Sequence, residues 1–185
     1  MIIDIDYHGV VADTVAQKQR YAFEMFGVEL QPTQCKRETI INSGLLSEND
    51  YRQLARQLYF TDKALESPSV EGSVEALLSL SEEHSVHIVT ASKEIQIPLI
   101  KQWLAERELG HIALINVGYN GNKDVHDYDV FVDDKLTVLQ ALRNNNSVKL
   151  LLDRPYNMPR TACVIANAGS FACFSASVAS VRPPG

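Results

Sequence analysis

The chain opens with Met1–Thr14, MIIDIDYHGVVADT, and this stretch decides how the rest of the sequence is interpreted. The short apolar run over residues 2–5 is typical of a buried strand, with carboxylates inside it and directly after it. Gly9 then indicates a turn, and Asp13–Thr14 is a typical helix start. In an open α/β sheet, ligands bind outside the carboxyl ends of the strands. The stretch therefore predicts a metal- or phosphate-binding site at the end of the first strand.

The composition is that of one globular domain with room for a small insertion. The chain has 185 residues, of which 45% are hydrophobic and 22% charged, and its formal net charge is −6. This acidic balance, without a basic stripe, argues against binding to nucleic-acid polymers or to a membrane surface. No apolar run approaches the roughly 18 residues of a membrane span, and we expect no signal peptide before the first strand. The three cysteines have neither metal-binding nor disulfide spacing, so we expect a cytoplasmic location.

The remaining sequence shows one long helical stretch and then alternating strands and helices. Residues 15–69 have helical spacing, which predicts a small helical cap inserted after the first strand. Residues 1–14 and 70–160 form the predicted core, an α/β Rossmann-like parallel sheet with helices on both faces. Its expected later strands are 86–89, 113–117, 130–132 and 148–152, and its expected helices are 74–80, 93–109 (ended by Gly110) and 136–143. The atypical C-terminal tail, residues 161–185, offers only Cys163–Ala166 as one more strand.

Polar side chains follow the successive expected strands. They are Asp4, Asp6 and His8 for the first strand, Thr90 and Ser92 for the next, Lys123 in the loop after the third, and Asp133 and Asp134 after the fourth. Because the carboxyl ends of parallel strands meet at one edge, we expect these residues to lie together. Carboxylates from two strands can hold Mg²⁺, a lysine and a hydroxyl can bind phosphoryl oxygens, and an aspartate can attack phosphorus.

This ordered set resembles the four motifs of the haloacid dehalogenase (HAD) superfamily. Motif one is similar to Asp6–Thr14, motif two to Val89–Ser92, motif three to Lys123, and motif four to Val130–Asp134. Within the superfamily the chain is most similar to the 5'(3')-deoxyribonucleotidases. Those proteins likewise place a lysine ten residues before an Asp-Asp pair, and end a late strand with a segment like Asp153–Asn157. The expected fold is therefore HAD-like.

The resemblance implies an Mg²⁺-dependent phosphomonoesterase that acts on a small phosphate ester, nucleotidase-like, through an aspartyl-phosphate. It implies Asp6 as the nucleophile and His8 at the acid–base position. The implied metal ligands are Asp6, Asp133, Asp134 and the backbone carbonyl at His8, and the implied phosphate-binding residues are Gly9, Thr90, Ala91 and Lys123. The helical insertion matches the family's small cap, which screens the site and reads the leaving group.

His8 stands where family phosphatases carry a second aspartate, two residues after the nucleophile. An imidazole can do general acid–base work near neutral pH, but a nearby cation lowers its pKa. The departure leaves two alternatives open: cleavage of a C–P or C–halogen bond on the same scaffold, or binding without turnover. A rival register takes Asp4 as nucleophile and Asp6 as acid–base, but it requires an insertion before Gly9. We favour Asp6, which leaves Asp4 as an unexplained acidic residue inside a strand.

The other candidate residues receive structural interpretations. We expect His87, inside a strand, to be a core histidine with satisfied hydrogen bonds, and His126 to lie in a helical connection. Tyr21, Phe23 and Phe26 of the cap could stack on a base, although a helical core needs the same residue types. Cys163 and Cys173 are expected to be small apolar residues rather than nucleophiles.

Overall fold

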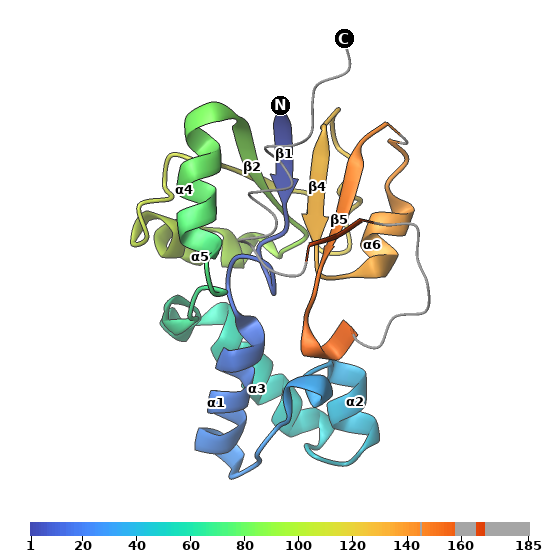
Figure 1. Ribbon diagram of the computed structural model, residues 1–185. Coiled ribbons are helices and arrows are strands. Elements are labelled where there is room, and N and C mark those ends of the chain that lie inside the picture. The colour runs from blue at the N-terminus through green and yellow to red at the C-terminus, as the bar shows by residue number, and fades with distance from the viewer. Residues whose placement is uncertain (145, 158–165, 169–185) are drawn as a thin grey trace.

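The computed structural model describes residues 1–144, 146–157 and 166–168, and a parallel six-stranded sheet forms its centre. Its strands are β1 (Ile2–Ile5), β2 (Ser85–Thr90), β3 (Ala113–Asn116), β4 (Val130–Asp133), β5 (Val148–Leu152) and β6 (Ala166–Ala168). They lie in the order β3-β2-β1-β4-β5-β6, with parallel register at every pair (Figure 1). The predicted Rossmann-like sheet is confirmed. The strand order reverses between β1 and β4, the position where such sheets bind ligands.

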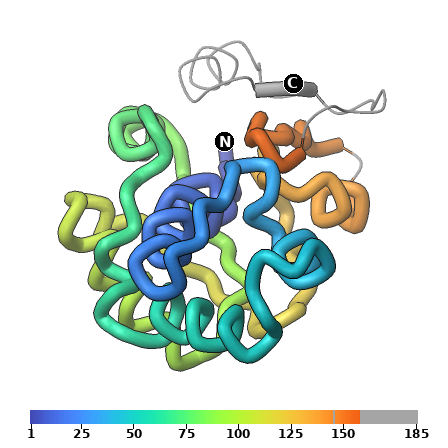
Figure 2. The backbone as a smooth tube through the Cα atoms, turned by 90° about the horizontal axis from the view of Figure 1, so that it is seen from below, coloured from blue at the N-terminus to red at the C-terminus, as the bar shows by residue number. Residues whose placement is uncertain are grey.

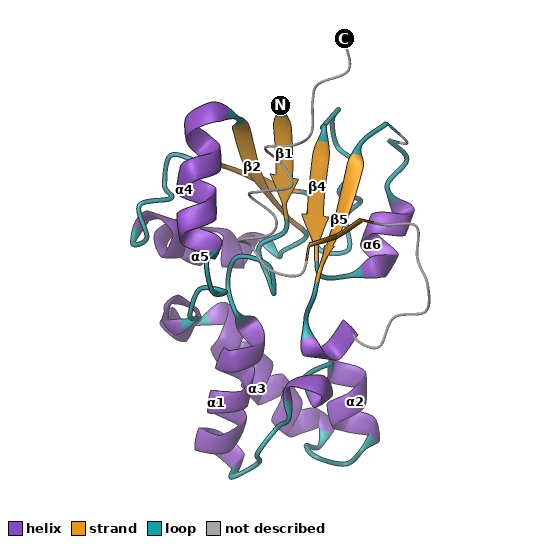
Figure 3. Ribbon diagram, viewed as in Figure 1, coloured by secondary structure: helices purple, strands orange, loops and turns teal. Residues whose placement is uncertain are grey.

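Helices cover both faces of the sheet, as predicted (Figure 3). On one face, α4 (Ser73–Glu83) and α5 (Ile97–Ala105) pack against Ile3, Ile5 and Val132. On the other face, α6 (Leu136–Ala141) packs against Phe131 and Leu151. Strands buried on both faces need apolar residues at consecutive positions, which explains the near-continuous apolar runs of β1, β4 and β5.

Helices make up the regular structure between β1 and α4. They are α1 (Thr14–Phe26), the 3₁₀ turn η1 (Pro32–Gln34), α2 (Arg37–Asn42), α3 (Glu48–Phe60) and the 3₁₀ turn η2 (Asp62–Glu66). They enclose a small apolar core of their own around Tyr21, Leu54 and Leu58. Figure 1 shows these helices beyond the carboxyl ends of the strands, and in Figure 2, viewed from below, they lie in front of the sheet. We refer to this helical segment as the cap.

Two backbone contacts fix the points where the chain crosses between sheet and cap. The Asp13 N–H donates to the Pro68 carbonyl (2.7 Å), and the Val70 N–H donates to the Val11 carbonyl (2.9 Å). Nearby, the indole of Trp103 on α5 donates to the Ser67 carbonyl (2.8 Å). Both ends of the cap are therefore anchored to the core. Among the described residues, no helix is long and apolar enough to cross a bilayer.

The expected helix over residues 93–109 is wrong in its extent. The chain forms a 3₁₀ turn, η3 (Glu94–Gln96), and α5 then ends at Ala105 rather than at Gly110. The left-handed residue is Glu108 (φ 64°), and this turn returns the fully buried Leu109 to the core. Burial of an apolar side chain therefore outweighs the glycine signal.

One smaller expectation is wrong, and the structure bears on two others. His126 lies in the loop between β3 and β4 and not in a helix. In the cap, Phe23 is 56% exposed, whereas Tyr21 belongs to the cap core. β6 (Ala166–Ala168) shares Ala166 with the expected strand Cys163–Ala166, and the other three residues of that strand lie outside the described part of the chain. Cys163, Cys173 and the other uncertain parts of the tail lie outside the described residues.

Replacement of Ile100 by alanine tests the packing of α5 on the sheet. Ile100 is 3% exposed in the core, and we expect Ile100→Ala to lower the free energy of unfolding by about 2–4 kcal/mol. Ile95 is the matched control because it is 64% exposed, and its replacement by alanine should cost less than about 0.5 kcal/mol. Chemical denaturation of both variants measures the difference, and equal losses would contradict the packing described here.

Candidate active site

Three buried carboxylates meet at the carboxyl ends of β1 and β4. Asp6 directly follows β1, Asp133 ends β4, and Asp134 comes next in the chain. Ligand oxygens of all three lie within 4.8 Å of one another. The Asp6 N–H donates to the Val132 carbonyl (2.9 Å), so the pairing of β1 with β4 extends into the site and brings the carboxylates together. Neighbouring strands thus produce the cluster that the sequence spacing suggested.

The Lys123 ammonium lies between two of these carboxylates. Its Nζ is 2.6 Å from Asp6 Oδ1 and 2.7 Å from Asp133 Oδ2. Only 6% of the residue is exposed, so burial opposes its charge. The Asp6 and Asp133 carboxylates outweigh that penalty and raise the pKa of Lys123 above its ordinary value. Lys123 therefore remains a fixed positive charge at neutral pH.

One lysine does not neutralise three carboxylates, so the cluster keeps an excess of negative charge that affects the pKa values of its members. Burial first, and then the charge of Asp6, raises the pKa of both Asp133 and Asp134. The Asp134 Oδ1 atom is buried and has no hydrogen-bond partner among the described residues. Clustered carboxylate oxygens are the ligands that hard divalent cations prefer. The donor set therefore fits a divalent metal, which would relieve the repulsion and use the unpaired oxygen.

Gly9 allows the first loop to pass close to Asp134. Its φ is 86°, and a Cβ built on it would lie 2.5 Å from Asp134 Oδ2 and 2.7 Å from the Tyr156 hydroxyl. The Tyr156 hydroxyl in turn donates to Asp134 Oδ2, and Asn157 Nδ2 donates to the Asp134 carbonyl (3.0 Å). The Gly9 N–H donates to the Ala12 carbonyl (2.8 Å), so in this structure Gly9 provides space rather than a free donor.

A chain of polar side chains links the end of β2 to His8. Thr90 Oγ1 and Ser92 Oγ are 2.7 Å apart, and Ser92 Oγ is 3.4 Å from His8 Nε2. A cavity of about 610 Å³ opens beside them. Its lining includes Asp6, His8, Thr90, Ala91, Lys123 and Lys135. The predicted phosphate-binding side chains thus face one space together with the proposed nucleophile.

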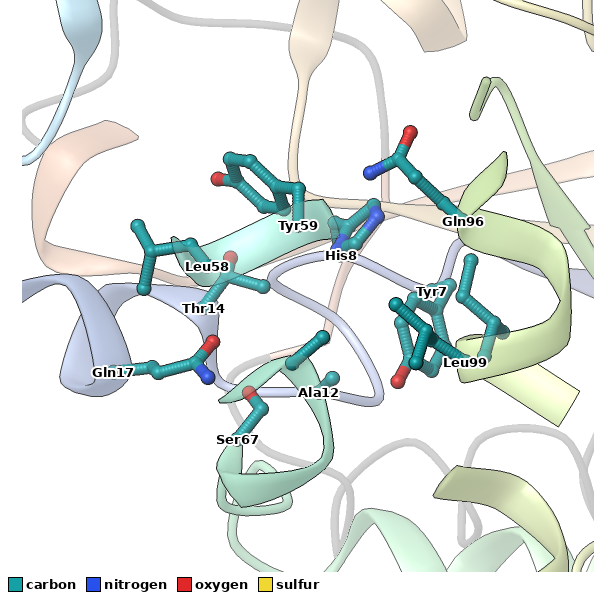
Figure 4. Close-up of a pocket in the computed structure, with 12 residues that line it drawn as sticks. Tyr7, His8, Ala12, Thr14, Gln17, Leu58, Tyr59, Ser67, Gln96 and Leu99 are labelled. Carbon is teal, nitrogen blue, oxygen red and sulfur yellow. The ribbon is translucent and has the colours of Figure 1, made fainter. Parts of the chain in front are cut away.

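The His8 ring lies between the core and the cap. Its centroid is 4.8 Å from the ring of Tyr7 and 5.4 Å from that of Tyr59 on α3, both edge to face (Figure 4). Nδ1 is shielded from solvent and has no partner in the part of the chain that is described. Burial lowers the pKa of His8 to about 4, although the Asp6 charge opposes this. His8 is therefore neutral at physiological pH.

Comparison with known proteins identifies the family. A model of the 5' nucleotidase, deoxy (pyrimidine), cytosolic type C protein (NT5C) family matches residues 1–170. The chain belongs to this nucleotidase family. A candidate nucleotidase of Oceanobacillus iheyensis, OB0422, is 28% identical over 167 residues, which cover 80% of this chain and 86% of that protein. The resemblance to HAD-type nucleotidases is confirmed, and the chain is an enzyme of the phosphatase type.

Solved structures of HAD hydrolases share the fold of this nucleotidase-family protein. One from Deinococcus radiodurans, with bound phosphate and sodium, is 16% identical with a TM-score of 0.64, covering 96% of this chain and 94% of that one. YfnB of Bacillus subtilis, described as a HAD-hydrolase bound to magnesium, is 12% identical with a TM-score of 0.60, covering 97% and 98%. HAD hydrolases generally use a divalent metal, which agrees with the carboxylate cluster. The alternatives of C–P cleavage, C–halogen cleavage and binding without turnover are not favoured.

The structure separates the two aspartates of β1. Asp6 lies with Asp133, Asp134 and Lys123, whereas Asp4 contacts His87 of β2 and His126 of the loop before β4 and takes no part in the carboxylate cluster. The rival register, with Asp4 as nucleophile, therefore has no support in the geometry.

Two polar residues of the nucleotidase-family site received no role from the sequence. The Tyr156 hydroxyl contacts Asp134, although the segment around it is short and was noted only for its resemblance. Lys135 follows the Asp-Asp pair and lines the cavity, and the three nearby carboxylates raise its pKa against burial. A lysine after an aspartate pair is usually solvated, so only the fold could identify it.

Gly9→Ala tests the close approach to Asp134. We expect it to displace the Asp134 carboxylate and to reduce the affinity of the carboxylate cluster for a divalent cation at least tenfold, because the added Cβ would overlap that side chain. Gly44→Ala is the matched control: its φ is 71°, but a Cβ there meets nothing within 4 Å. It should cost only the left-handed backbone penalty of about 1–2 kcal/mol in stability. Calorimetric Mg²⁺ titration of both variants makes the comparison, and unchanged affinity in Gly9→Ala would refute the steric argument.

Proposed function

We propose that this protein is an Mg²⁺-dependent phosphomonoester hydrolase that acts on a deoxyribonucleoside monophosphate or a similar small ester through an aspartyl-phosphate. The observation that carries the proposal is the Asp6 carboxylate, held 2.6 Å from Lys123 and clustered with Asp133 and Asp134. This arrangement supplies a nucleophile, metal ligands and a phosphate-binding cation within one buried site.

Each residue of the cluster has a distinct proposed task. Asp6, Asp133, Asp134 and the His8 carbonyl would hold the metal, which supplies positive charge for the phosphoryl oxygens when bound. Lys123 would bind a second phosphoryl oxygen. The hydroxyl of Thr90 and the backbone at Gly9 and Ala91 would complete the phosphate site; for Gly9 this requires its N–H to leave the Ala12 carbonyl.

The reaction would proceed in two displacements at phosphorus. A carboxylate oxygen of Asp6 forms a bond to phosphorus as the bond to the ester oxygen breaks, and the leaving alcohol takes up a proton. Water then attacks the phosphorus of the aspartyl-phosphate, loses a proton, and regenerates the Asp6 carboxylate with release of inorganic phosphate. The Lys123 ammonium, which contacts Asp6 directly in this structure, would turn to the phosphoryl group during both steps.

His8 would serve the second displacement better than the first. Because its pKa is lowered to about 4, roughly one molecule in 10³ carries the imidazolium at pH 7. A neutral imidazole can accept a proton from the attacking water, but its one N–H is too weak an acid to protonate the leaving group. We therefore expect leaving groups that depart without protonation to react much faster than alkoxides.

The cap would provide the space for the leaving group. We propose that residues 15–69 act as a cap on a core made of residues 1–14 and 70–160. A cavity of about 590 Å³ is lined both by His8 and Asp134 of the site and by cap residues that include Lys18, Arg37 and Tyr59. Its size and mixture of aromatic and cationic side chains suit a small anionic ester.

Conversion of each β1 aspartate to asparagine tests the nucleophile. Asp6→Asn should reduce Mg²⁺-dependent phosphate release from deoxyribonucleoside monophosphates by at least about 10³-fold, because the amide cannot form the acyl phosphate. Asp4→Asn is the matched control, from the same strand, and should retain turnover. The measurement is phosphate release by both variants and the wild type, with and without Mg²⁺. Loss of activity in Asp4→Asn with retention in Asp6→Asn would move the nucleophile to Asp4.

The neutral state of His8 predicts a strong dependence on the leaving group. The ratio of kcat/KM for p-nitrophenyl phosphate to that for a deoxyribonucleoside 5'-monophosphate should fall at least tenfold in His8→Asp, which restores a carboxylic acid near the leaving oxygen. His8→Gln, which carries no titratable proton, should keep the high ratio.

The pH dependence has a definite sign. The pKa of His8 lies below its ordinary value, so its protonated form gains population only as the pH falls toward 4. The pH–rate profiles of the wild type and of His8→Gln with p-nitrophenyl phosphate should therefore have the same shape between pH 6 and 8. An inflection near pH 6.5 that this variant abolishes would show that His8 titrates normally.

A further inference from the structure

A second group of metal-ligating side chains lies apart from the carboxylate cluster. Asp4 Oδ1, His87 Nδ1 and His126 Nε2 form a triangle in which each pair of atoms is 3.2 Å apart. Asp4 is completely buried, while the side chains of His87 and His126 are 20% and 29% exposed. One edge of the triangle is therefore open toward solvent.

The fold brings these three residues together from distant parts of the chain. Asp4 and His87 are register partners in the adjacent strands β1 and β2, and their side chains share one face of the sheet. His126 comes from the loop before β4. Ser85 Oγ lies 3.2 Å from His87 Nε2, so the far nitrogen of that ring is also engaged. Such a contact orients a metal-binding histidine, because it fixes which nitrogen faces the ion.

Hydrogen bonds alone leave this group incompletely satisfied. If His87 Nδ1 and His126 Nε2 both carry protons, both can donate to Asp4 Oδ1, but the two nitrogens cannot form a hydrogen bond with each other. If one nitrogen loses its proton, it accepts from the other ring but no longer donates to Asp4. Asp4 Oδ2 has no partner among the described residues, and burial raises the pKa of Asp4 against the opposing effect of the two histidines. A cation would instead accept lone pairs from all three atoms.

The dimensions of the triangle match a tetrahedral ion. Corners of an equilateral triangle with 3.2 Å edges lie about 1.8 Å from its centre. An ion at the zinc–ligand distance of about 2.0–2.1 Å would then lie about 1 Å from the plane, with ligand–metal–ligand angles near 100°. We propose that Asp4, His87 and His126 form a binding site for Zn²⁺ or a similar transition-metal ion, with its fourth position open to water.

The donor set separates this site from the catalytic one. Two imidazoles and one carboxylate favour zinc and its neighbours, whereas the all-carboxylate cluster of Asp6, Asp133 and Asp134 favours Mg²⁺. The ion would join β1, β2 and the loop before β4. Because His126 lies three residues after Lys123, binding would also restrain the segment that carries the active-site lysine.

Cobalt spectroscopy on the full chain, saturated with Mg²⁺, tests the site directly. One equivalent of Co²⁺ should give the intense visible absorption of a tetrahedral ion, whereas an ion held by carboxylates and water gives only weak bands. His126→Ala and His126→Gln should abolish the intense absorption. The double variant His84→Ala/His111→Ala is the matched control: it removes two histidines outside the triangle and should keep the absorption.

X-ray absorption on the zinc-loaded wild type needs no variant and is the second measurement. It should count two imidazole ligands, and Zn²⁺ added in the presence of Mg²⁺ should raise the midpoint of thermal unfolding by a few degrees. Weak cobalt bands only, an intense band that survives both His126 substitutions, or a zinc ion without imidazole ligands would each overturn the proposal. The triangle would then be a hydrogen-bonded group alone.

Discussion

The contact of the Lys123 ammonium with Asp6 and Asp133 is the interaction on which the site depends. Three carboxylates buried within 4.8 Å of one another repel strongly, and burial together with this repulsion raises the pKa of Asp133 and of Asp134. Lys123, itself buried, offsets part of that repulsion through contacts of 2.6 Å with Asp6 and 2.7 Å with Asp133. Its loop has to cross the ends of the strands to deliver it. The charge balance of the site therefore depends both on the parallel sheet, which gathers the carboxylates, and on the long loop before β4, which brings Lys123 to them.

The same crowding gives His8 a different place in the chemistry from the aspartate it replaces. In the mechanism we propose, a carboxylic acid at that position would share in both proton transfers, because neighbouring negative charge raises its pKa toward neutrality. The pKa of a buried imidazole shifts in the opposite direction, because burial disfavours the charged form. For His8 the pKa is lowered to about 4. The rings of Tyr7 and Tyr59 pack edge to face on His8 and contribute to the burial that lowers its pKa.

The residues that follow the strands could be predicted from the sequence, whereas the features that depend on tertiary packing could not. Apolar runs followed by Asp6, Thr90 and Asp133 suffice to place those residues at one edge, because parallel strands share their polarity. The end of α5 was wrong because the burial of Leu109 decides it, and no local signal reports that burial. The segment Asp153–Asn157 was noticed only for its resemblance, and the contact of Tyr156 with Asp134 could not be predicted from it, because that contact joins residues 22 positions apart and depends on how the chain folds back.

The acidic residue inside β1 follows from the alternation of side chains along a strand. Ile3 and Ile5 belong to the apolar cluster formed with α4 and α5, so Asp4 and Asp6 point to the opposite side. The loop before β4 runs over that side and meets both: Lys123 contacts Asp6, and three residues later His126 contacts Asp4 at 3.2 Å. The loop before β4 therefore has a polar partner at each of these two positions. Asp4 is thus explained as a buried partner for His126 and His87, although it takes no part in the carboxylate cluster.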